Sequence, residues 1–135
     1  MLVSAWNPLE LNEMALPPCH YAWQLSVIGG KLHLSFSMRS LDVFLGCPFN
    51  IASYGLLLEI LAKYAGLSPG ILTGFFTNVH VYSNHVEQVK EQLSRTPFEL
   101  PKLILQDSNV VDWSHDLAKL EGYQHHPAIK APIAV

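Results

Sequence analysis

The chain has 135 residues, of which 50% are hydrophobic and 14% are charged. This composition excludes a disordered chain, and the length suits one domain with a buried core. A formal net charge of −3 argues against a protein that wraps nucleic acid, so we expect no specific nucleic-acid partner. The hydrophobic fraction is high for a free-standing soluble domain, which favours a chain that covers part of its surface with a partner.

The two cysteines, Cys19 and Cys47, have no CxxC spacing and predict neither a disulfide framework nor a metal site. Free thiols of this kind suit a reducing compartment, so we expect a cytoplasmic protein. The longest apolar stretch, residues 51–65, is interrupted by one serine and two charged residues and is too short to cross a bilayer. The first residues lack the pattern of a signal peptide. The sequence therefore predicts a soluble protein with no membrane partner.

The first forty residues predict three strands. Residues 3–6 favour a short strand that ends at an Asn-Pro pair. The two prolines at 17 and 18 keep the segment before Cys19 extended, because each fixes its own φ and restricts the preceding residue. Residues 21–28 and 31–38 favour strands joined by a hairpin at Gly29-Gly30. The second of these strands alternates apolar and polar residues, which predicts one buried face.

The middle of the chain predicts a helix and a further strand region. Residues 50–64 are mostly apolar and favour a buried helix that ends at Gly66. The pair at 69–70, Pro-Gly, favours a turn. Residues 71–82 are rich in β-forming side chains.

The last third of the chain is more polar. Asn84, followed by Glu87, predicts a cap that opens a helix running to about Arg95. Residues 102–106 favour a strand, and the tail from Gly122 is expected to be irregular. Together the elements predict the α+β class, with a mixed β-sheet packed on a central hydrophobic helix.

Cys19, in the motif LPPCH, is the candidate nucleophile. The alternative is a small buried hydrophobic residue, which is the usual fate of a lone cysteine. A rigid Pro-Pro entry, the adjacent His20 and the Arg39-Ser40 pair one hairpin away favour a reactive thiol, because a nearby cation stabilises the thiolate. Cys47 has apolar neighbours and is expected only to pack.

Four motifs stand in register along the chain: LPPCH, RSLDVFLGCPFNIASY, HVYSNH and EGYQHHPAIKAPIAV. In their order and approximate spacing they resemble the thymidylate synthase family, from VSAWN near residue 3 to the last residue. The resemblance implies the fold of that family and an enzyme that methylates dUMP. It also implies methylenetetrahydrofolate as the co-substrate that supplies both carbon and reducing power, no metal, and a homodimer.

The resemblance also implies roles for individual residues. Cys19 matches the nucleophile that adds to carbon six of the pyrimidine. The segments that match the family's dUMP-binding residues contain Arg39, Ser40, Leu41, Asp42, Asn50, His80, Val81 and Tyr82. The segments that match its folate-binding residues contain Asp42, Gly46, Ala134 and Val135. Alternation along a strand is expected to place His80 and Tyr82 on one face.

For three of these residues simpler roles stay open. Arg39 could be a surface arginine, although its place at the end of a buried strand makes this the weaker interpretation. Asn50 could cap the helix that it opens. Tyr82 could pack inside the sheet.

Two positions depart from the family pattern. Met38 stands where glutamine usually precedes the Arg-Ser pair, and residues 75–79 replace a segment that usually contains Gly-Asp. Both changes leave open a dUMP hydroxymethylase of the same fold, in which water rather than hydride completes the reaction. Asn50 favours uracil over cytosine, because cytosine-directed relatives carry an aspartate there.

The resemblance covers a carboxyl-terminal portion of the family's domain. We therefore expect residues 1–135 to be a single portion of a thymidylate synthase-like catalytic domain, truncated at the amino terminus. The missing segment carries the family's catalytic glutamate and further phosphate-binding arginines. This predicts self-association or a complementing amino-terminal chain, and the alternative is a catalytically silent fragment that acts as an association module.

Overall fold

The computed structural model describes residues 1–107 and 112–133. They form two compact units, Met1–His80 and Val81–Val135, and each is described by itself. Within the described residues, no helix is both long and apolar enough to cross a membrane.

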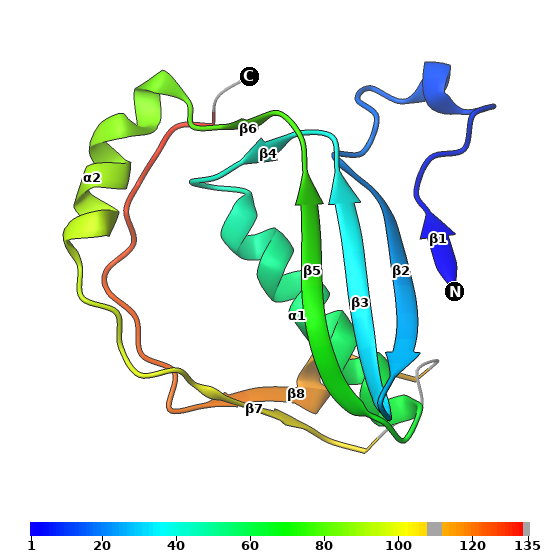
Figure 1. Ribbon diagram of the computed structural model, residues 1–135. Coiled ribbons are helices and arrows are strands. Elements are labelled where there is room, and N and C mark those ends of the chain that lie inside the picture. Colours follow the sequence, from blue (N-terminus) through cyan, green and yellow to red (C-terminus); the bar gives the residue numbers. More distant parts are fainter. Residues whose placement is uncertain (108–111, 134–135) are drawn as a thin grey trace. The chain divides into compact units, whose positions relative to one another are not determined.

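The first unit is built on a four-stranded mixed sheet in the order β1-β2-β3-β5 (Figure 1). Its strands are β1 (Leu2–Ser4), β2 (His20–Ile28), β3 (Lys31–Met38) and β5 (Ser68–Phe76). The first three pair antiparallel, whereas β3 and β5 pair parallel. Gly29 and Gly30 make the predicted hairpin turn with φ angles of 58° and 75°, which only glycine adopts readily. The predicted mixed sheet is confirmed.

Helix α1 (Cys47–Tyr64) packs along one face of this sheet (Figure 1). The apolar residues of β3 alternate as predicted and bury one face, and α1 adds three buried side chains to the same core: Tyr54, Leu58 and Ala62. The helix begins three residues before its predicted start because Pro48 is tolerated in a first turn. It ends as predicted, with Gly66 at φ 65° and the Leu67 N–H donating to the Ala62 carbonyl at 2.9 Å.

The prediction of a turn at Pro69-Gly70 is wrong, because both residues lie inside β5. Proline is tolerated there since β5 is an edge strand of the sheet. The pairing with β3 is irregular between Leu32 and Leu34, and the His33 ring occupies this point. His33 Nδ1 accepts a hydrogen bond from the Ile71 N–H at 3.1 Å. A Cβ at residue 70 would come within 2.8 Å of that ring, which explains the glycine.

Two short strands extend the parallel pair. β4 (Leu41–Asp42) follows β3 after two residues, and β6 (Val79–His80) follows β5 after two residues. β4 and β6 also pair parallel, so the chain makes two turns side by side at the carboxyl ends of two neighbouring strands.

The second unit contains helix α2 (Val86–Ser94) and an antiparallel pair, β7 (Lys102–Leu105) with β8 (Ala118–Glu121). The predicted cap at Asn84 is wrong: Asn84 lies within a short 3-10 helix, Ser83–His85, and His85 occupies the cap position of α2. β7 matches the predicted strand, whereas β8 was not predicted. The described residues after Gly122 form neither helix nor strand, as expected.

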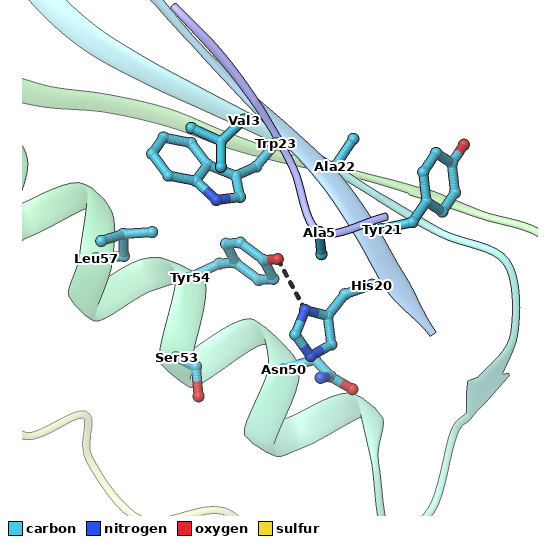
Figure 2. Close-up of a pocket in the computed structure, with 10 residues that line it drawn as sticks. All are labelled: Val3, Ala5, His20, Tyr21, Ala22, Trp23, Asn50, Ser53, Tyr54 and Leu57. Carbon is cyan, nitrogen blue, oxygen red and sulfur yellow. Dashed lines mark hydrogen bonds between the residues drawn. The ribbon is translucent and has the colours of Figure 1, made fainter. Parts of the chain in front are cut away.

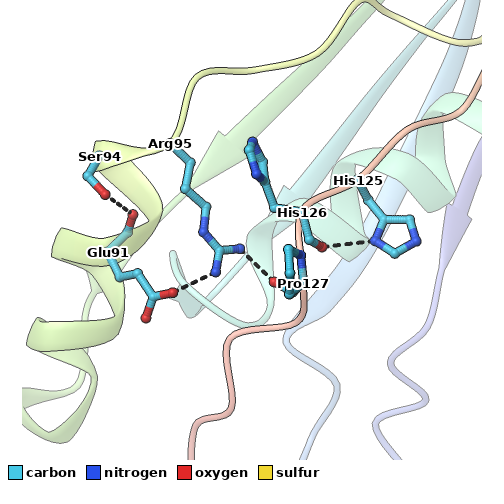
Figure 3. Close-up of polar contacts among 6 residues, drawn as sticks. All are labelled: Glu91, Ser94, Arg95, His125, His126 and Pro127. Atoms are coloured by element: carbon cyan, nitrogen blue, oxygen red, sulfur yellow. Dashed lines mark hydrogen bonds and ion pairs between the residues drawn. The ribbon is translucent and has the colours of Figure 1, made fainter.

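Side-chain contacts hold this irregular segment (Figure 3). Arg95 binds the Glu91 carboxylate at 2.5 Å and donates to the Pro127 carbonyl at 2.6 Å. His126 Nε2 contacts the Thr96 carbonyl at 2.9 Å. The segment is therefore fixed to α2 and to the residues that follow it, although it has no regular structure of its own.

Candidate active site

Most of the predicted site residues gather at one end of the sheet of the first unit. The carboxyl ends of β3 and β5, the start of β2 and the first turn of α1 supply them. Arg39 N–H donates to the Cys19 carbonyl at 2.8 Å, and His20 pairs with Met38 across the strands. Antiparallel pairing of β2 with β3 thus brings the predicted nucleophile next to the predicted phosphate-binding pair.

Cys19 is half-buried and stands on a braced segment. The Arg39 Nε and Nη2 atoms donate to the Pro17 carbonyl at 3.2 and 2.6 Å, and Trp6 Nε1 donates to the Pro18 carbonyl at 3.1 Å. Two prolines and three hydrogen bonds leave the approach to Cys19 little conformational freedom. The β2–β3 register also shifts between His20 and Ala22, and such irregularities re-aim the side chains beside them.

The turns after β3 and β5 bind each other. Thr77 Oγ1 donates to the Arg39 carbonyl at 3.0 Å, and Asn78 Nδ2 donates to Ser40 Oγ at 3.2 Å. The Asn78 carbonyl accepts from the Leu41 N–H at 3.2 Å and contacts His80 Nδ1 at 2.8 Å. One hydrogen-bond network between the two turns consequently positions Arg39, Ser40 and His80.

Asp42, Gly46 and Asn50 lie along the entry to α1. Gly46 N–H donates to the Asp42 carbonyl at 3.2 Å, and Asn50 N–H donates to the Gly46 carbonyl at 3.0 Å. A Cβ at residue 46 would come within 3.1 Å of that Asp42 oxygen, so the close approach favours glycine. Gly46 occupies the cap position, which makes the capping alternative for Asn50 wrong. The Asp42 carboxylate accepts from the Phe44 N–H at 3.0 Å.

A cavity of about 370 Å³ opens between β1, β2 and α1 (Figure 2). His20 Nδ1 and the Tyr54 hydroxyl lie 3.2 Å apart in its wall, and the Tyr54 ring stacks on Phe36 with centroids 4.1 Å apart. Burial raises the pKa of Tyr54 above its usual value. The described residues that line it are Val3, Ala5, His20, Tyr21, Ala22, Trp23, Asn50, Ser53, Tyr54 and Leu57.

The remaining predicted residues do not belong to the described part of the first unit. Val81 and Tyr82 belong to the second unit, where Tyr82 has an extended backbone before the 3-10 helix and its ring lies edge-on to His85 at 5.6 Å. The prediction that His80 and Tyr82 share a strand face is wrong, because β6 ends at His80. Ala134 and Val135 lie outside the described residues.

Two residues of this region were not predicted from the sequence. Tyr54 follows Asn50 by four positions, a spacing that places both on one side of a helix and could have indicated it. Asn78 lies in the segment noted only for departing from the family pattern. Its φ of 45° is rare outside glycine, and no feature of the sequence indicated it.

A family model described as thymidylate synthase matches residues 1–135. The chain belongs to the thymidylate synthase family. Thymidylate synthases of Listeria monocytogenes serotype 4b and Listeria innocua serovar 6a are 52% and 51% identical over the whole chain, which covers 44% of each relative. The crystal structure of thymidylate synthase from T4 phage superposes with a TM-score of 0.88 at 45% identity, over 99% of this chain and 52% of that one. The chain thus has the α+β fold of the family and spans about half the length of its relatives.

Proposed function

We propose that the chain is the nucleophile-bearing part of a thymidylate synthase, which transfers a one-carbon unit from methylenetetrahydrofolate to carbon five of dUMP. The observation that carries the proposal is the gathering of Cys19, Arg39, Ser40, Asn50 and His80 around the end of one sheet, in a chain that belongs to this family.

Cys19 acts as the nucleophile. Its thiolate forms a bond to carbon six of the pyrimidine, and the electron pair of the C5–C6 double bond moves toward the carbonyl at carbon four. The resulting enolate is nucleophilic at carbon five, which unmodified uracil is not. Once carbon five has bonded the one-carbon unit, it gives up its proton to a general base, the carbon–sulfur bond breaks and the thiolate is regenerated. The braced segment before Cys19 fixes the backbone from which the thiol projects, which supports attack from a restricted geometry.

Arg39 and Ser40 bind the phosphate of dUMP. A guanidinium offers five donors in a planar fork, so Arg39 can hold the Pro17 carbonyl and contact phosphate oxygens with its other N–H groups. Asn50 reads the uracil edge, because its amide both donates and accepts. His80 and Tyr82 bind the deoxyribose hydroxyl, and Leu41, Asp42 and Val81 complete the nucleotide-binding segments.

Methylenetetrahydrofolate supplies the carbon and the reducing equivalent when it is bound. Asp42 and Gly46 line its site, and residue 46 presents only backbone there, since a Cβ would come within 3.1 Å of the Asp42 carbonyl oxygen. The Asp42 carboxylate can accept a hydrogen bond from a pterin amine beside the one that it accepts from Phe44. Ala134 and Val135 close the site over the folate.

An amino-terminal part, in the same polypeptide or a separate one, supplies the general acid/base and the rest of the phosphate clamp. This chain covers only 44% of the length of its Listeria monocytogenes relative, which supports the need for such a part. The assembled enzyme is a cytoplasmic homodimer, in which residues 1–135 form one portion of a catalytic domain.

Covalent labelling tests the proposal. The chain is mixed with an amino-terminal fragment of a relative and incubated with 5-fluoro-dUMP and methylenetetrahydrofolate, which trap the adduct. We expect one equivalent of label that is lost in Cys19→Ser and kept in Cys47→Ser. Label on Cys47 would overturn the assignment of the nucleophile. Absence of label in every mixture would favour the association module.

A dUMP hydroxymethylase is the second candidate. Met38 and Phe76 place two apolar side chains side by side where the family pattern has Gln and, nearby, Gly-Asp. The product of the complemented enzyme decides between the candidates, since chromatography separates dTMP from hydroxymethyl-dUMP.

A further inference from the structure

Asn78 connects the two turns of the candidate site. It has a left-handed backbone with φ 45°, a conformation that asparagine tolerates better than most residues. Its side chain contacts Ser40, and its carbonyl contacts Leu41 and His80. The conformation of this single residue therefore affects the positions of both Ser40, which is predicted to bind the phosphate, and His80, which is predicted to bind the sugar.

The contact with His80 defines the tautomer of that ring. His80 Nδ1 lies 2.8 Å from the Asn78 carbonyl oxygen. A carbonyl oxygen can only accept, so Nδ1 must carry the proton. In the neutral ring Nε2 then carries a lone pair, and it can accept a hydrogen bond from a hydroxyl group.

The contact with Asn78 determines how the Ser40 hydroxyl group takes part in hydrogen bonding. Asn78 Nδ2 is a donor only, so Ser40 Oγ is the acceptor over the 3.2 Å between them. The hydroxyl proton of Ser40 is not used in this bond and can be donated to another acceptor. A phosphate oxygen is such an acceptor.

We propose that Asn78 is a positioning residue that sets the direction of two hydrogen bonds to the nucleotide. Ser40 donates to the phosphate, and His80, held as the Nδ1–H tautomer, accepts from the sugar hydroxyl. The proposal rests on the proposed function. It makes the site specific for a 5′-phosphorylated nucleoside whose deoxyribose carries a hydroxyl, and it excludes an analogue with fluorine at the 3′ position, because fluorine cannot donate.

Nitrogen NMR of the 135-residue chain, labelled with ¹⁵N-histidine, reads the tautomer without any ligand. The signals of His80 are assigned with His80→Gln. We expect protonation at Nδ1 in the neutral ring of the wild type. Asn78→Gly keeps the carbonyl and accepts the left-handed φ, so it should keep this tautomer. Asn78→Ala disfavours that φ and should shift the population toward Nε2–H.

Titration with nucleotides, in the mixture of the chain with the amino-terminal fragment, then tests the Ser40 contact. Asn78→Gly should weaken binding of dUMP by about three- to tenfold, as expected for the loss of one hydrogen bond, and binding of deoxyuridine by less than about twofold. Asn12→Gly, at an exposed asparagine in the 3-10 helix Leu11–Glu13, is the matched control and should change neither affinity.

The results separate this proposal from the proposed function. A neutral His80 protonated at Nε2, or equal losses of dUMP and deoxyuridine affinity in Asn78→Gly, would overturn the role of Asn78. A chain that shows the Nδ1–H tautomer yet binds no nucleotide when it is mixed with the amino-terminal fragment would support that role and overturn the proposed function.

Discussion

Met38 and Phe76 lie opposite each other in the parallel pairing of β3 with β5. Met38 is buried in the core, and the Phe76 ring meets Phe36 edge-on with centroids 5.5 Å apart. The sequence departs from the family pattern at Met38 and within residues 75–79, and the fold makes these departures neighbours. Both departures therefore change the packing at the same end of the sheet, next to Arg39.

Gly74→Ala tests how tightly this place is packed. A Cβ at residue 74 would come within 2.2 Å of Phe76 Cζ, so the ring would have to leave Phe36. We expect a loss of about 1–3 kcal/mol in the free energy of unfolding, measured with urea. Phe76→Ala removes the ring, and in that background Gly74→Ala should cost much less. Additive effects of the two substitutions would contradict the contact.

Tyr54 predicts a pH dependence of stability. Its pKa is raised by burial, so the folded state holds the phenol proton more tightly than the unfolded state. The protonated phenol therefore contributes to the free energy of unfolding. This contribution is complete below the usual tyrosine pKa of about 10, and it is lost as the pH rises through the higher pKa of the folded state. Tyr54→Phe removes it.

Urea unfolding between pH 7 and 11 measures the effect. At neutral pH the wild type should be more stable by about 1 kcal/mol or less, because the hydroxyl lies 3.2 Å from His20. Above pH 10 the difference should shrink and then reverse. A constant difference over the whole range would show that burial of Tyr54 does not affect its ionisation.

The sequence predicted those elements that depend on local pattern. β3 alternates without exception, and Gly66 ends α1, so both were placed correctly. Pro69-Gly70 was misassigned because a proline can lie in an edge strand, and only the sheet order reveals the edge. Tyr82 was misplaced because β-forming residues continue beyond the end of β6. The contacts of Asn78 could not be predicted, since they come from the pairing of two turns 38 residues apart in the chain.

Asn50→Asp should change the preferred base. The Asn50 side chain lines the cavity beside His20, at the first turn of α1. An amide complements the N3–H and carbonyl of uracil, whereas a carboxyl group complements the different donor pattern of cytosine. We expect the wild type to prefer dUMP over dCMP and the variant to shift toward dCMP in competition titrations. Equal binding of both nucleotides by the wild type would contradict this role.

His85 should influence folate binding through the carboxyl-terminal segment. The His85 side chain is fully buried, and its Nε2 lies 2.7 Å from the Pro132 carbonyl. If Ala134 and Val135 close over the folate, His85→Ala should weaken the ternary complex with 5-fluoro-dUMP and methylenetetrahydrofolate at least several-fold and weaken dUMP binding much less, through the Tyr82 ring beside it. His125→Ala, at an exposed histidine of the same segment, is the control. Equal weakening of both complexes would indicate general unfolding instead.

The 135-residue chain alone should show no steady-state turnover. The reaction needs the thiolate, a proton relay and a closed folate site together, and such groups lose activity far more than additively when one is missing. Helix α1 is apolar on most sides, yet Phe49 and Ile51 are 75% and 47% exposed, which leaves apolar surface for a further segment to cover.

Gel filtration of the chain at several concentrations should therefore show self-association that an added amino-terminal fragment reduces. Assays of dTMP formation from dUMP and methylenetetrahydrofolate should show activity only in the mixture, and Cys19→Ser should abolish it. Turnover by the purified chain without the fragment would overturn the proposed need for a complementing part. It would also mean that a carboxylate within these residues, with Glu59 or Glu87 the first to substitute, serves as the proton relay.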